Sequence, residues 1–376
     1  MTRILVVPGS YKSTFKSIYA ARRLGDALET TIPDSEVTSV VLADGGEGTL
    51  ECFQLLFGGD FAEYKVSGPL GSQLSARVLW LSRSVAVVES AEVVGYSLLS
   101  LEDRDPWRAS SYGVGELLGA LIAQGAAEIY VTMGDSIIMD MGIGMLSALG
   151  VQFRSGNSHL PRPTLRELPT VTELHIPHPL LPNHVRVHGL VDTVEPILGS
   201  NGQAAVYGAQ KGLAPSEAPA VEAAHVHLDR LVFSHLGIRI GMIPMGTGSG
   251  GLAGALACFL GAKLEQTLEY LDAKVGLTKL IDSAEIVITG EGRLDGQSRW
   301  GKVPYWVGSR ARGSLVLLVG EATKEAIAHL RIGSVANLHC VEMGVGTFDV
   351  EEQFARGVYR VAVVASSLIR LPGVLG

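Results

Sequence analysis

A cluster of charged residues and glycines directly after an apolar segment is the strongest sign of chemistry in this chain. Residues 286–289 read Ile-Val-Ile-Thr, and residues 290–298 then combine glycines with Glu291, Arg293 and Asp295. Such apolar runs are typical of buried parallel strands, and ligands of α/β sheets bind just beyond the carboxyl ends of these strands. A cation beside two carboxylates on a flexible backbone suits a phosphorylated ligand with a metal ion. A solvated turn is the alternative, but it requires fewer glycines and no such cluster.

A second glycine-rich segment, Asp-Gly-Gly-Glu-Gly at residues 44–48, lies between a predicted strand and a predicted helix. Backbone N–H groups at the start of a helix favour anions, which makes Gly45 and Gly46 candidate phosphate-binding residues. Asp44 and Glu47 could instead hold a metal or the hydroxyl groups of a small substrate. The alternative is a capping box, because Glu47 follows Asp44 by three residues.

Two further groups could contact phosphates. Ser10 and Lys12 follow the first predicted strand, at residues 3–8, and Lys12 could bind a carboxylate or a phosphate. Residues 246–251 match the G-x-G-x-x-G pattern before a predicted helix, a pattern that suits a dinucleotide or a triphosphate. The candidate glycines of this segment are Gly246, Gly248 and Gly250.

The segment 296–302 approaches a P-loop sequence, but it is rejected as one. Val303 follows Lys302 and has no hydroxyl group for Mg²⁺, and the segment lies several residues beyond its strand. Lys302 therefore stays a candidate phosphate ligand, with a solvated lysine as the alternative.

The order of predicted elements indicates an α/β protein. A βαβα pattern opens the chain, short strands near 64–66, 76–81 and 84–89 suggest an antiparallel meander, and residues 155–185 show weak periodicity and are expected to be irregular. The alternation of predicted strands and helices resumes near residue 284. The simplest architecture has two domains. Residues 1–60 and 280–376 form a Rossmann-like, doubly wound parallel-sheet domain, and residues 61–279 form an inserted second α/β domain.

Composition excludes several classes of protein. The 376 residues are 47% hydrophobic and 18% charged, which argues against disorder. The net charge of −8 and the lack of Lys/Arg runs argue against nucleic-acid binding. The longest apolar stretch is too short to span a membrane, and the N-terminus lacks a signal peptide. We therefore expect a cytoplasmic protein with a small-molecule substrate, and the sequence leaves a homo-oligomer open.

Four segments together resemble a known family. Residues 43–49, 109–117, 201–212 and 290–298 are similar, in order and spacing, to signatures of bacterial glycerate kinases of the glyoxylate and glycerate pathway type. The resemblance implies a two-domain α/β fold and the ATP- and Mg²⁺-dependent transfer of the γ-phosphoryl group to a hydroxyl of glycerate. The product would be phosphoglycerate.

The resemblance also suggests roles for individual residues. Asp192 matches the first acid of the family's Asp-Val-x-Asn-Pro pattern and is the candidate base, with Asp295 as competitor. Either acid could instead hold Mg²⁺. Arg293 and Lys12 complete the candidate catalytic set. Ser136 and Asp140 match the family's Gly-Gly-Ser-Ala-Thr-Asn-Asp-Gly-Gly pattern and are candidate substrate ligands.

Several positions depart from the family. Gly9 and Glu195 replace an acid and an amide, Asp135 adds a negative charge, and an apolar run replaces small and hydroxyl-bearing residues at Ile137, Ile138, Met139 and Met141. These departures keep open a divergent member with another hydroxy-acid substrate or with lost turnover. Restoring the family residues at 135 and 137–139 should then raise glycerate phosphorylation. A nicotinamide-dependent (NAD(P)) oxidoreductase of a small hydroxy acid, based on the Gly246 segment, is the third hypothesis.

Overall fold

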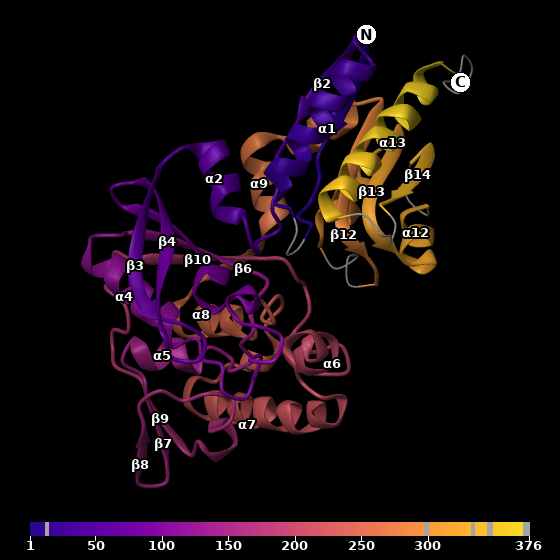
Figure 1. Cartoon of the computed structure of the whole chain (residues 1–376). Helices are drawn as coiled ribbons and strands as arrows, with labels where there is room; N and C mark the ends of the chain where they lie inside the picture. The colour runs from indigo at the N-terminus through magenta and orange to yellow at the C-terminus, as the bar shows by residue number, and fades with distance from the viewer. Residues whose placement is uncertain (12–14, 297–300, 332–334, 344–348, 371–376) are drawn as a thin grey trace. The chain divides into compact units, whose positions relative to one another are not determined.

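The computed structural model describes residues 1–11, 15–296, 301–331, 335–343 and 349–370 (Figure 1). The chain divides into two compact units: Met1–Asp44 with Leu268–Gly376, here the first unit, and Gly45–Thr267, the second unit. The boundaries predicted from the sequence, near residues 60 and 280, differ from these. The chain leaves the first unit before the helix at 49–57, and it returns before two further helices that precede residue 284.

A five-stranded parallel sheet is the centre of the first unit, in the order β2-β1-β12-β13-β14. Strands from both ends of the chain share this sheet, as the sequence predicts. Its elements are β1 (Thr2–Val6), α1 (Ser17–Thr31), β2 (Ser35–Ser39), α9 (Thr267–Val275), α10 (Leu277–Ser283), β12 (Ile286–Leu294), α11 (Val303–Gly308), β13 (Ser314–Ala322), α12 (Lys324–Arg331), β14 (Asn337–Glu342) and α13 (Val350–Arg370).

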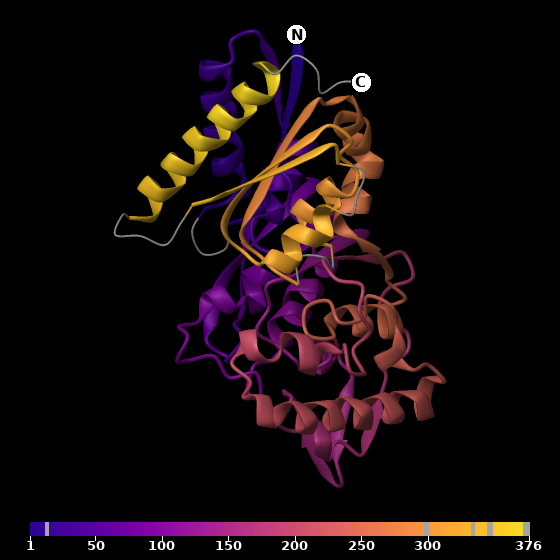
Figure 2. The same ribbon diagram turned by 90° about the vertical axis from the view of Figure 1, so that its right-hand side faces the viewer.

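Helices cover both faces of this sheet (Figures 1 and 2). Successive strand residues point to opposite faces, so Val316 and Leu318 of β13 pack with α1 and α13 in one core cluster. Leu315 points to the other face, where a Cβ added to Gly308 of α11 would meet Leu315 and Leu330 of α12. Burial on both faces explains why the strands read as continuous apolar runs.

Strand β12 is longer than the sequence predicts. It continues through Leu294, and Glu291 and Arg293 pair with Val319 and Glu321 of β13. The prediction that these charges follow the strand was therefore wrong. β13 is equally long and offers backbone partners, and Gly290 lets β13 come close because a Cβ there would lie 1.8 Å from Leu318 O.

The second unit contains a six-stranded mixed sheet in the order β11-β10-β6-β5-β4-β3. Strands β3, β4 and β5 are antiparallel neighbours, as predicted, whereas β5, β6, β10 and β11 run parallel. The elements around this sheet are α2 (Thr49–Phe57), β3 (Asp60–Ser67), β4 (Gln73–Ser82), β5 (Val85–Glu89), α3 (Ala91–Val94), α4 (Tyr112–Ala123), β6 (Glu128–Met133), α5 (Ile143–Ala148), β10 (Arg186–Val191), α6 (Gln203–Tyr207), α7 (Ala218–Leu236), α8 (Leu252–Leu260) and β11 (Lys263–Gln266).

The segment expected to be irregular contains a small antiparallel sheet. Its strands are β7 (Gln152–Ser155), β8 (Ser158–Leu160) and β9 (Glu173–His175). Phe153 and Leu174 face each other across β7 and β9, and both side chains are buried. The strands are so short that their alternation could not be recognised in the sequence.

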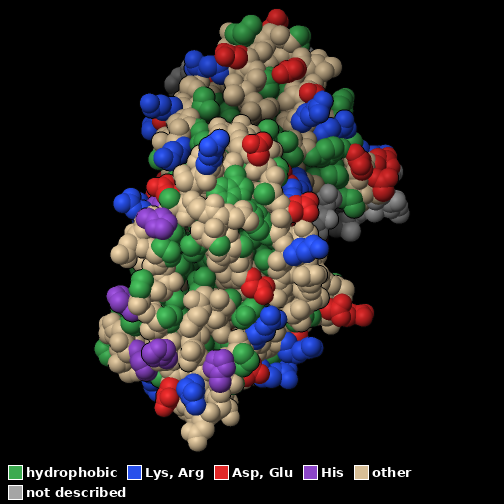
Figure 3. All heavy atoms as spheres, turned by 90° about the vertical axis from the view of Figure 1, so that its left-hand side faces the viewer, with side chains coloured by type: hydrophobic (Ala, Val, Ile, Leu, Met, Phe, Trp, Pro, Cys, Tyr) green, Lys and Arg blue, Asp and Glu red, His purple; other side chains and the backbone are tan. Residues whose placement is uncertain are grey.

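Charges of both signs are mixed on the surface. Lys and Arg side chains are interspersed with Asp and Glu side chains over the face drawn in Figure 3. This face lacks the large patch of one sign that nucleic-acid binding requires. Among the described residues, none of the helices is both long and apolar enough to cross a membrane.

Candidate functional site

The carboxyl ends of four parallel strands meet at one edge of the sheet in the second unit. Strand β5 ends at Glu89, β6 at Met133, β10 at Val191 and β11 at Gln266. The predicted site residues Ser136 and Asp192 follow two of these strands. Ligands of parallel α/β sheets bind outside this edge, so it is the candidate site of the second unit.

The glycine-rich segment at residues 45–48 packs against this edge. A Cβ added to Gly45 would lie 2.7 Å from Thr267 Oγ1 and 3.2 Å from Met133 O, and a Cβ added to Gly134 would lie 2.8 Å from Gly46 Cα and 3.1 Å from Asp192 Oδ2. Only residues without a side chain allow such an approach of two backbone segments. The glycines therefore bring the segment, the end of β6 and the Asp192 carboxylate together.

Asp135 connects this segment with the loop after β6. Its carboxylate accepts hydrogen bonds from Glu47 N (3.1 Å) and from the Tyr96 hydroxyl (3.0 Å). Its φ of +50° is in the left-handed region, which costs a non-glycine residue about 1 kcal/mol or more. Asp135, a residue that differs from the family pattern, thus fixes the backbone of Glu47, whose own side chain is exposed.

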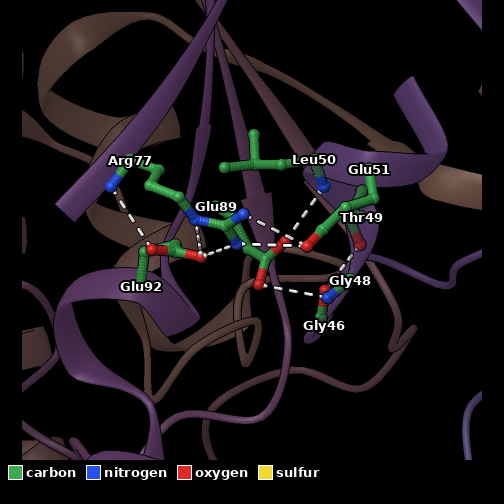
Figure 4. Close-up of polar contacts among 8 residues, drawn as sticks. All are labelled: Gly46, Gly48, Thr49, Leu50, Glu51, Arg77, Glu89 and Glu92. Atoms are coloured by element: carbon green, nitrogen blue, oxygen red, sulfur yellow. Dashed lines mark hydrogen bonds and ion pairs between the residues drawn. The ribbon is translucent and has the colours of Figure 1, made fainter. Parts of the chain in front are cut away.

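The N-terminus of α2 is occupied by a protein carboxylate. Glu89 accepts hydrogen bonds from Gly48 N (3.3 Å) and Leu50 N (3.0 Å), as Figure 4 shows. Glu89 already supplies acceptor oxygens to two N–H groups at the start of this helix, which have no partner within the helix. Asp44 does not cap this helix, because its N-cap residue is Gly48. Binding of an anion by Gly45 and Gly46, whose N–H groups are not the ones bound by Glu89, stays a prediction.

Burial dominates the chemistry of Glu89. Its side chain is buried beside Arg77, which forms ion pairs with Glu51 and Glu92 (Figure 4). Desolvation raises the pKa of Glu89 to about 8, and the negative charges of Glu92 and Glu51 raise it further, against the two backbone hydrogen bonds. At neutral pH this carboxyl group is therefore mostly protonated.

We expect the stability of the protein to depend on pH through Glu89. A folded-state pKa above the unfolded value stabilises the protein at low pH, and this stability is lost as pH rises from about 4.5 to about 8. The shift corresponds to at most roughly 5 kcal/mol. Glu89→Gln should flatten the dependence of the free energy of unfolding on pH in this window, as measured by urea denaturation.

The exposed Glu63 on strand β3 offers a matched control for this measurement. Glu63→Gln removes the same charge from the surface and should leave the pH dependence as it is in the wild type. An unchanged slope in Glu89→Gln would contradict the role assigned to Glu89.

Asp192 lies directly after β10, beside buried polar groups. Thr193 and Glu195 are buried, and Glu195 Oε2 accepts hydrogen bonds from Val194 N (3.1 Å) and from the Tyr207 hydroxyl (3.3 Å). Burial and the charge of Asp192 raise the pKa of Glu195. The residue that replaces the family's amide is therefore an internal partner of this loop.

Lys211 is a residue that the sequence reasoning missed. Its side chain is only 4% exposed, and its ammonium group donates hydrogen bonds to Ser136 Oγ (3.1 Å) and Ile138 O (2.8 Å). Burial lowers its pKa to about 8, while Asp192, Asp140 and Asp135 oppose this shift. Its place in the motif at residues 201–212 was a signal, but the sequence does not reveal the contact with Ser136.

Asp140 is enclosed by protein donors. Its carboxylate accepts hydrogen bonds from Ser111 N (2.8 Å), Ser111 Oγ (2.8 Å), Gly142 N (3.1 Å) and Gly144 N (3.3 Å), and the side chain is buried. Burial raises its pKa against these four bonds. In this geometry Asp140 holds the starts of α4 and α5 together, and its buried carboxylate is already engaged by four protein donors.

The apolar run after Ser136 belongs to the hydrophobic core. Ile137, Ile138, Met139 and Met141 are each 0% exposed and lie in one core cluster of the second unit. The expectation that these side chains narrow a polar pocket is therefore not supported by their burial.

The glycines at residues 246–251 also serve close packing. A Cβ added to Gly250 would lie 1.9 Å from Ile138 O, and one added to Gly248 would lie 2.8 Å from Val191 Cγ1. Gly246 is restricted by Ile243 O at 2.7 Å. No strand precedes this segment within residues 237–245, which contain only the 3-10 turn Ile240–Met242. The strand–turn–helix context of a dinucleotide fingerprint is therefore missing.

The first unit has its own polar edge. Ser10 follows β1, Asp44 follows β2 and Glu291 lies in β12, and these three strands are parallel neighbours. Lys302 Nζ lies 3.0 Å from Asp44 Oδ2, and both side chains are largely buried. The expected phosphate ligand Lys302 is thus brought to Asp44.

Arg293 and Asp295 form an ion pair in the first unit. Arg293 Nε lies 3.3 Å from Asp295 Oδ2, with side chains that are 69% and 29% exposed. Both groups are accessible to a ligand. Lys12, the remaining candidate of the catalytic set, lies outside the described residues.

The carboxylates could hold a magnesium ion together with a ligand. Among the described residues there is no cluster of three His, Cys, Asp or Glu side chains that could hold a metal by itself. Mg²⁺ in phosphoryl-transfer sites is typically bound by only one or two carboxylates plus substrate phosphates and water. Single accessible acids such as Asp192 or Asp295 fit this mode of binding.

Comparison with known proteins gives a consistent result. Residues 4–371 match the sequence model of the Glycerate kinase family. The chain is 32% identical to a glycerate 2-kinase of Escherichia coli (strain K12), over 95% of this chain and 94% of that protein. It is also 32% identical to a glycerate kinase of Halalkalibacterium halodurans, over 83% of each chain.

A solved structure is similar over almost the whole chain. The crystal structure of a putative glycerate kinase 2 from Salmonella typhimurium LT2 aligns with a TM-score of 0.75 and 27% sequence identity, and the match covers 98% of both chains.

Proposed function

This chain belongs to the glycerate kinase family, and we propose that it transfers the γ-phosphoryl group of ATP to a hydroxyl of glycerate to give phosphoglycerate. The family match over residues 4–371 carries this proposal. The carboxyl edge of the second unit supports it, because Asp192 lies there beside Gly134 and the glycine-rich segment, and Ser136 follows in the same loop as Gly134. Phosphoryl transfer depends mainly on positioning and on charge neutralisation, which such an edge can supply.

In the second unit, we propose that Asp192 is the general base that activates the hydroxyl group of the hydroxy acid. A carboxylate at the end of β10 can accept the proton of the attacking hydroxyl, and Ser136 can hydrogen-bond the hydroxy acid. The backbone of Gly45 and Gly46 lines the same edge, with Glu47 next to it. Four further candidate residues act indirectly, through the packing and hydrogen-bond contacts described above. They are Asp140, Gly246, Gly248 and Gly250.

In the first unit, the order of strands supports binding of phosphates. Counted along this unit, the order is 2-1-3-4-5, that of a doubly wound sheet of the flavodoxin type, and we propose this class in place of a strictly Rossmann-like one. Ligands of such sheets bind where the first and third strands diverge, here β1 and β12. Ser10 and Glu291 lie at these strands, and Asp44, which follows the neighbouring β2, pairs with Lys302. We propose that these four residues contact ATP.

Mg²⁺ would neutralise the charge of the phosphates when it is bound. We propose that Asp192 or Asp295 would supply a carboxylate ligand. Asp295 is the alternative base, and the two acids can be distinguished by mutation.

Two other interpretations lose support. A nicotinamide-dependent oxidoreductase rested on the segment 246–251, which lacks its strand and whose glycines are restricted by protein atoms. A divergent member rested on Gly9, Asp135, Glu195 and the apolar run. The apolar run is core, and Asp135 and Glu195 have hydrogen-bond partners within the protein. We also propose a cytoplasmic enzyme. Cys52, Cys258 and Cys340 form no disulfide, which supports this proposal because disulfides are rare in that compartment.

A coupled ADP-release assay tests the function. The protein is incubated with ATP and Mg²⁺, and with glycerate, lactate, glycolate, tartronate or glycerol in turn. We expect glycerate to be turned over fastest, with a kcat on the order of 10 per second. No ADP release above the buffer rate with any hydroxy acid would refute the proposed function.

Substitution of Arg293 or Asp295 should separate function from structure. We expect Arg293→Ala and Asp295→Asn to lower kcat about 100-fold, roughly 2.7 kcal/mol of barrier, because their charges face phosphates in the reaction. Thermal unfolding should barely change, since both side chains are accessible. The matched control is Arg312→Ala, which breaks an exposed pair with Asp282 (3.1 Å) in the same unit. Full activity in both site variants would show that Arg293 and Asp295 form a surface ion pair without a role in catalysis.

A further inference from the structure

A buried cation in the second unit has no evident role in stability. The side chain of Lys211 is buried, and within the described part of the chain its ammonium group meets two acceptors, Ser136 Oγ and Ile138 O. Removing a charged group from water costs several kcal/mol, and replacement of such groups by apolar side chains is often neutral or stabilising. Stability alone therefore does not explain a lysine at this position.

The segment that Lys211 holds is the one that carries the candidate site. Gly134 packs against Gly46 and lies beside Asp192 Oδ2, and Asp135 accepts the hydrogen bond from Glu47 N. Ser136 and Ile138 follow in the same loop and are the two partners of Lys211. A displacement of this loop would therefore move the glycine-rich segment and the surroundings of Asp192 together.

A second buried group holds the next carbonyl of this loop. His225 Nε2 lies 2.9 Å from Met139 O, and the preceding carbonyl, Ile138 O, accepts the hydrogen bond from Lys211. Burial lowers the pKa of His225 to about 4, and the charge of Lys211 lowers it further, so His225 is neutral at pH 7. Lys211 is therefore the only one of these two groups whose charge changes between pH 7 and 9.

We infer that Lys211 is a positioning residue for phosphoryl transfer: its ammonium group holds the loop 134–138 so that the Ser136 hydroxyl and the Asp192 carboxylate face the hydroxy acid together. This inference rests on the proposed function. Lys211 acts through Ser136 and Ile138. A merely structural lysine would affect unfolding, whereas this one affects turnover and its dependence on pH.

The charge of Lys211 makes the inference testable by pH. Asp192, Asp140 and Asp135 favour its charged form and burial disfavours it, which leaves its pKa at about 8. His225 is a further titratable group whose pKa is coupled to the charge of Lys211. Because kcat/KM reports the ionisation of the free enzyme, kcat/KM for glycerate should fall about tenfold per pH unit above pH 8. A wild-type kcat/KM that is constant to pH 9.5 would overturn the inference without any variant.

Variants test the same inference at constant pH. We expect Lys211→Met to lower kcat for glycerate about 100-fold, with KM for ATP within about threefold of the wild type, and to abolish the fall of kcat/KM above pH 8. Ser136→Ala should lower kcat about tenfold. In the double variant the loss should match that of Lys211→Met alone, because two residues that act through one contact are not additive.

Arg239→Met is the control, because Arg239 is another cation of this unit and its guanidinium pairs with a different buried side chain, Asp229. It should change the melting temperature but leave the pH profile as in the wild type. Additive losses in the double variant, or a Lys211→Met protein with wild-type kcat, would overturn the positioning role. An inactive wild type would instead refute the proposed function, so the two failures are distinguishable.

Discussion

Asp192→Asn is expected to lower the kcat of glycerate phosphorylation by about 1,000-fold, or roughly 4 kcal/mol of barrier. A general base accounts for about 10²–10⁴ in rate, and the isosteric amide cannot accept the proton of the attacking hydroxyl. The amide fills the same space beside Gly134, so the melting temperature should stay close to that of the wild type. A coupled ADP-release assay and a thermal melt measure the two effects.

Glu265→Gln provides the control for Asp192. Glu265 lies on β11, the strand next to β10, and its carboxylate is at the surface with Lys263. This variant removes the same charge and should keep wild-type turnover. If Asp192→Asn were fully active while Asp295→Asn were inactive, the role of the base would pass to Asp295.

The second large effect concerns stability. Replacing the apolar run by the family residues, with Ile137→Ala, Ile138→Thr and Met139→Asn, is expected to unfold the protein at room temperature. Each side chain is 0% exposed, and truncation of a buried Ile or Met costs about 2–5 kcal/mol. Burial of a new amide or hydroxyl adds to the cost unless it finds a partner. The sum approaches the whole stability of a typical domain, about 5–15 kcal/mol.

Asp135→Gly alone is the informative comparison. It removes the acceptor of Glu47 N and the Tyr96 hydroxyl, but it also relieves a left-handed backbone at φ +50°. We expect this variant to fold, with urea denaturation showing a change within about 2 kcal/mol. A triple variant as stable as the wild type would show that the core repacks around the new side chains. The gain in glycerate phosphorylation expected from the sequence would then become measurable.

Much of the fold could be predicted from periodicity, because buried parallel strands and helices with one apolar face leave strong patterns. Helix α13 was expected at 350–368 and spans Val350–Arg370, and its buried Phe354, Val358 and Val361 show the helical spacing. Strand β12 was misjudged because glycines and charges usually end a strand. Its continuation depends on pairing with β13, which is a tertiary contact that sequence patterns do not contain.

The site was less predictable, because its key contacts join distant residues. Lys211 lies 75 residues from Ser136, and Glu89 lies 39 residues from Leu50. Glu89 reads as the end of a strand, and nothing in its neighbours indicates that it closes the start of α2. Asp140 matches a family motif, but its four donors are known only once Ser111 is placed beside it. Sequence identifies which residues matter more readily than what they contact.

The close approach of Gly45 to Thr267 has a consequence for engineering. These residues are the first and last of the second unit, and a Cβ on Gly45 would lie 2.7 Å from the Thr267 hydroxyl. The unit therefore begins and ends at one point, as inserted domains commonly do. Residues 45–267 can be regarded as a cassette that could be cut out, closed by a linker of a few residues, or exchanged for the matching cassette of a relative.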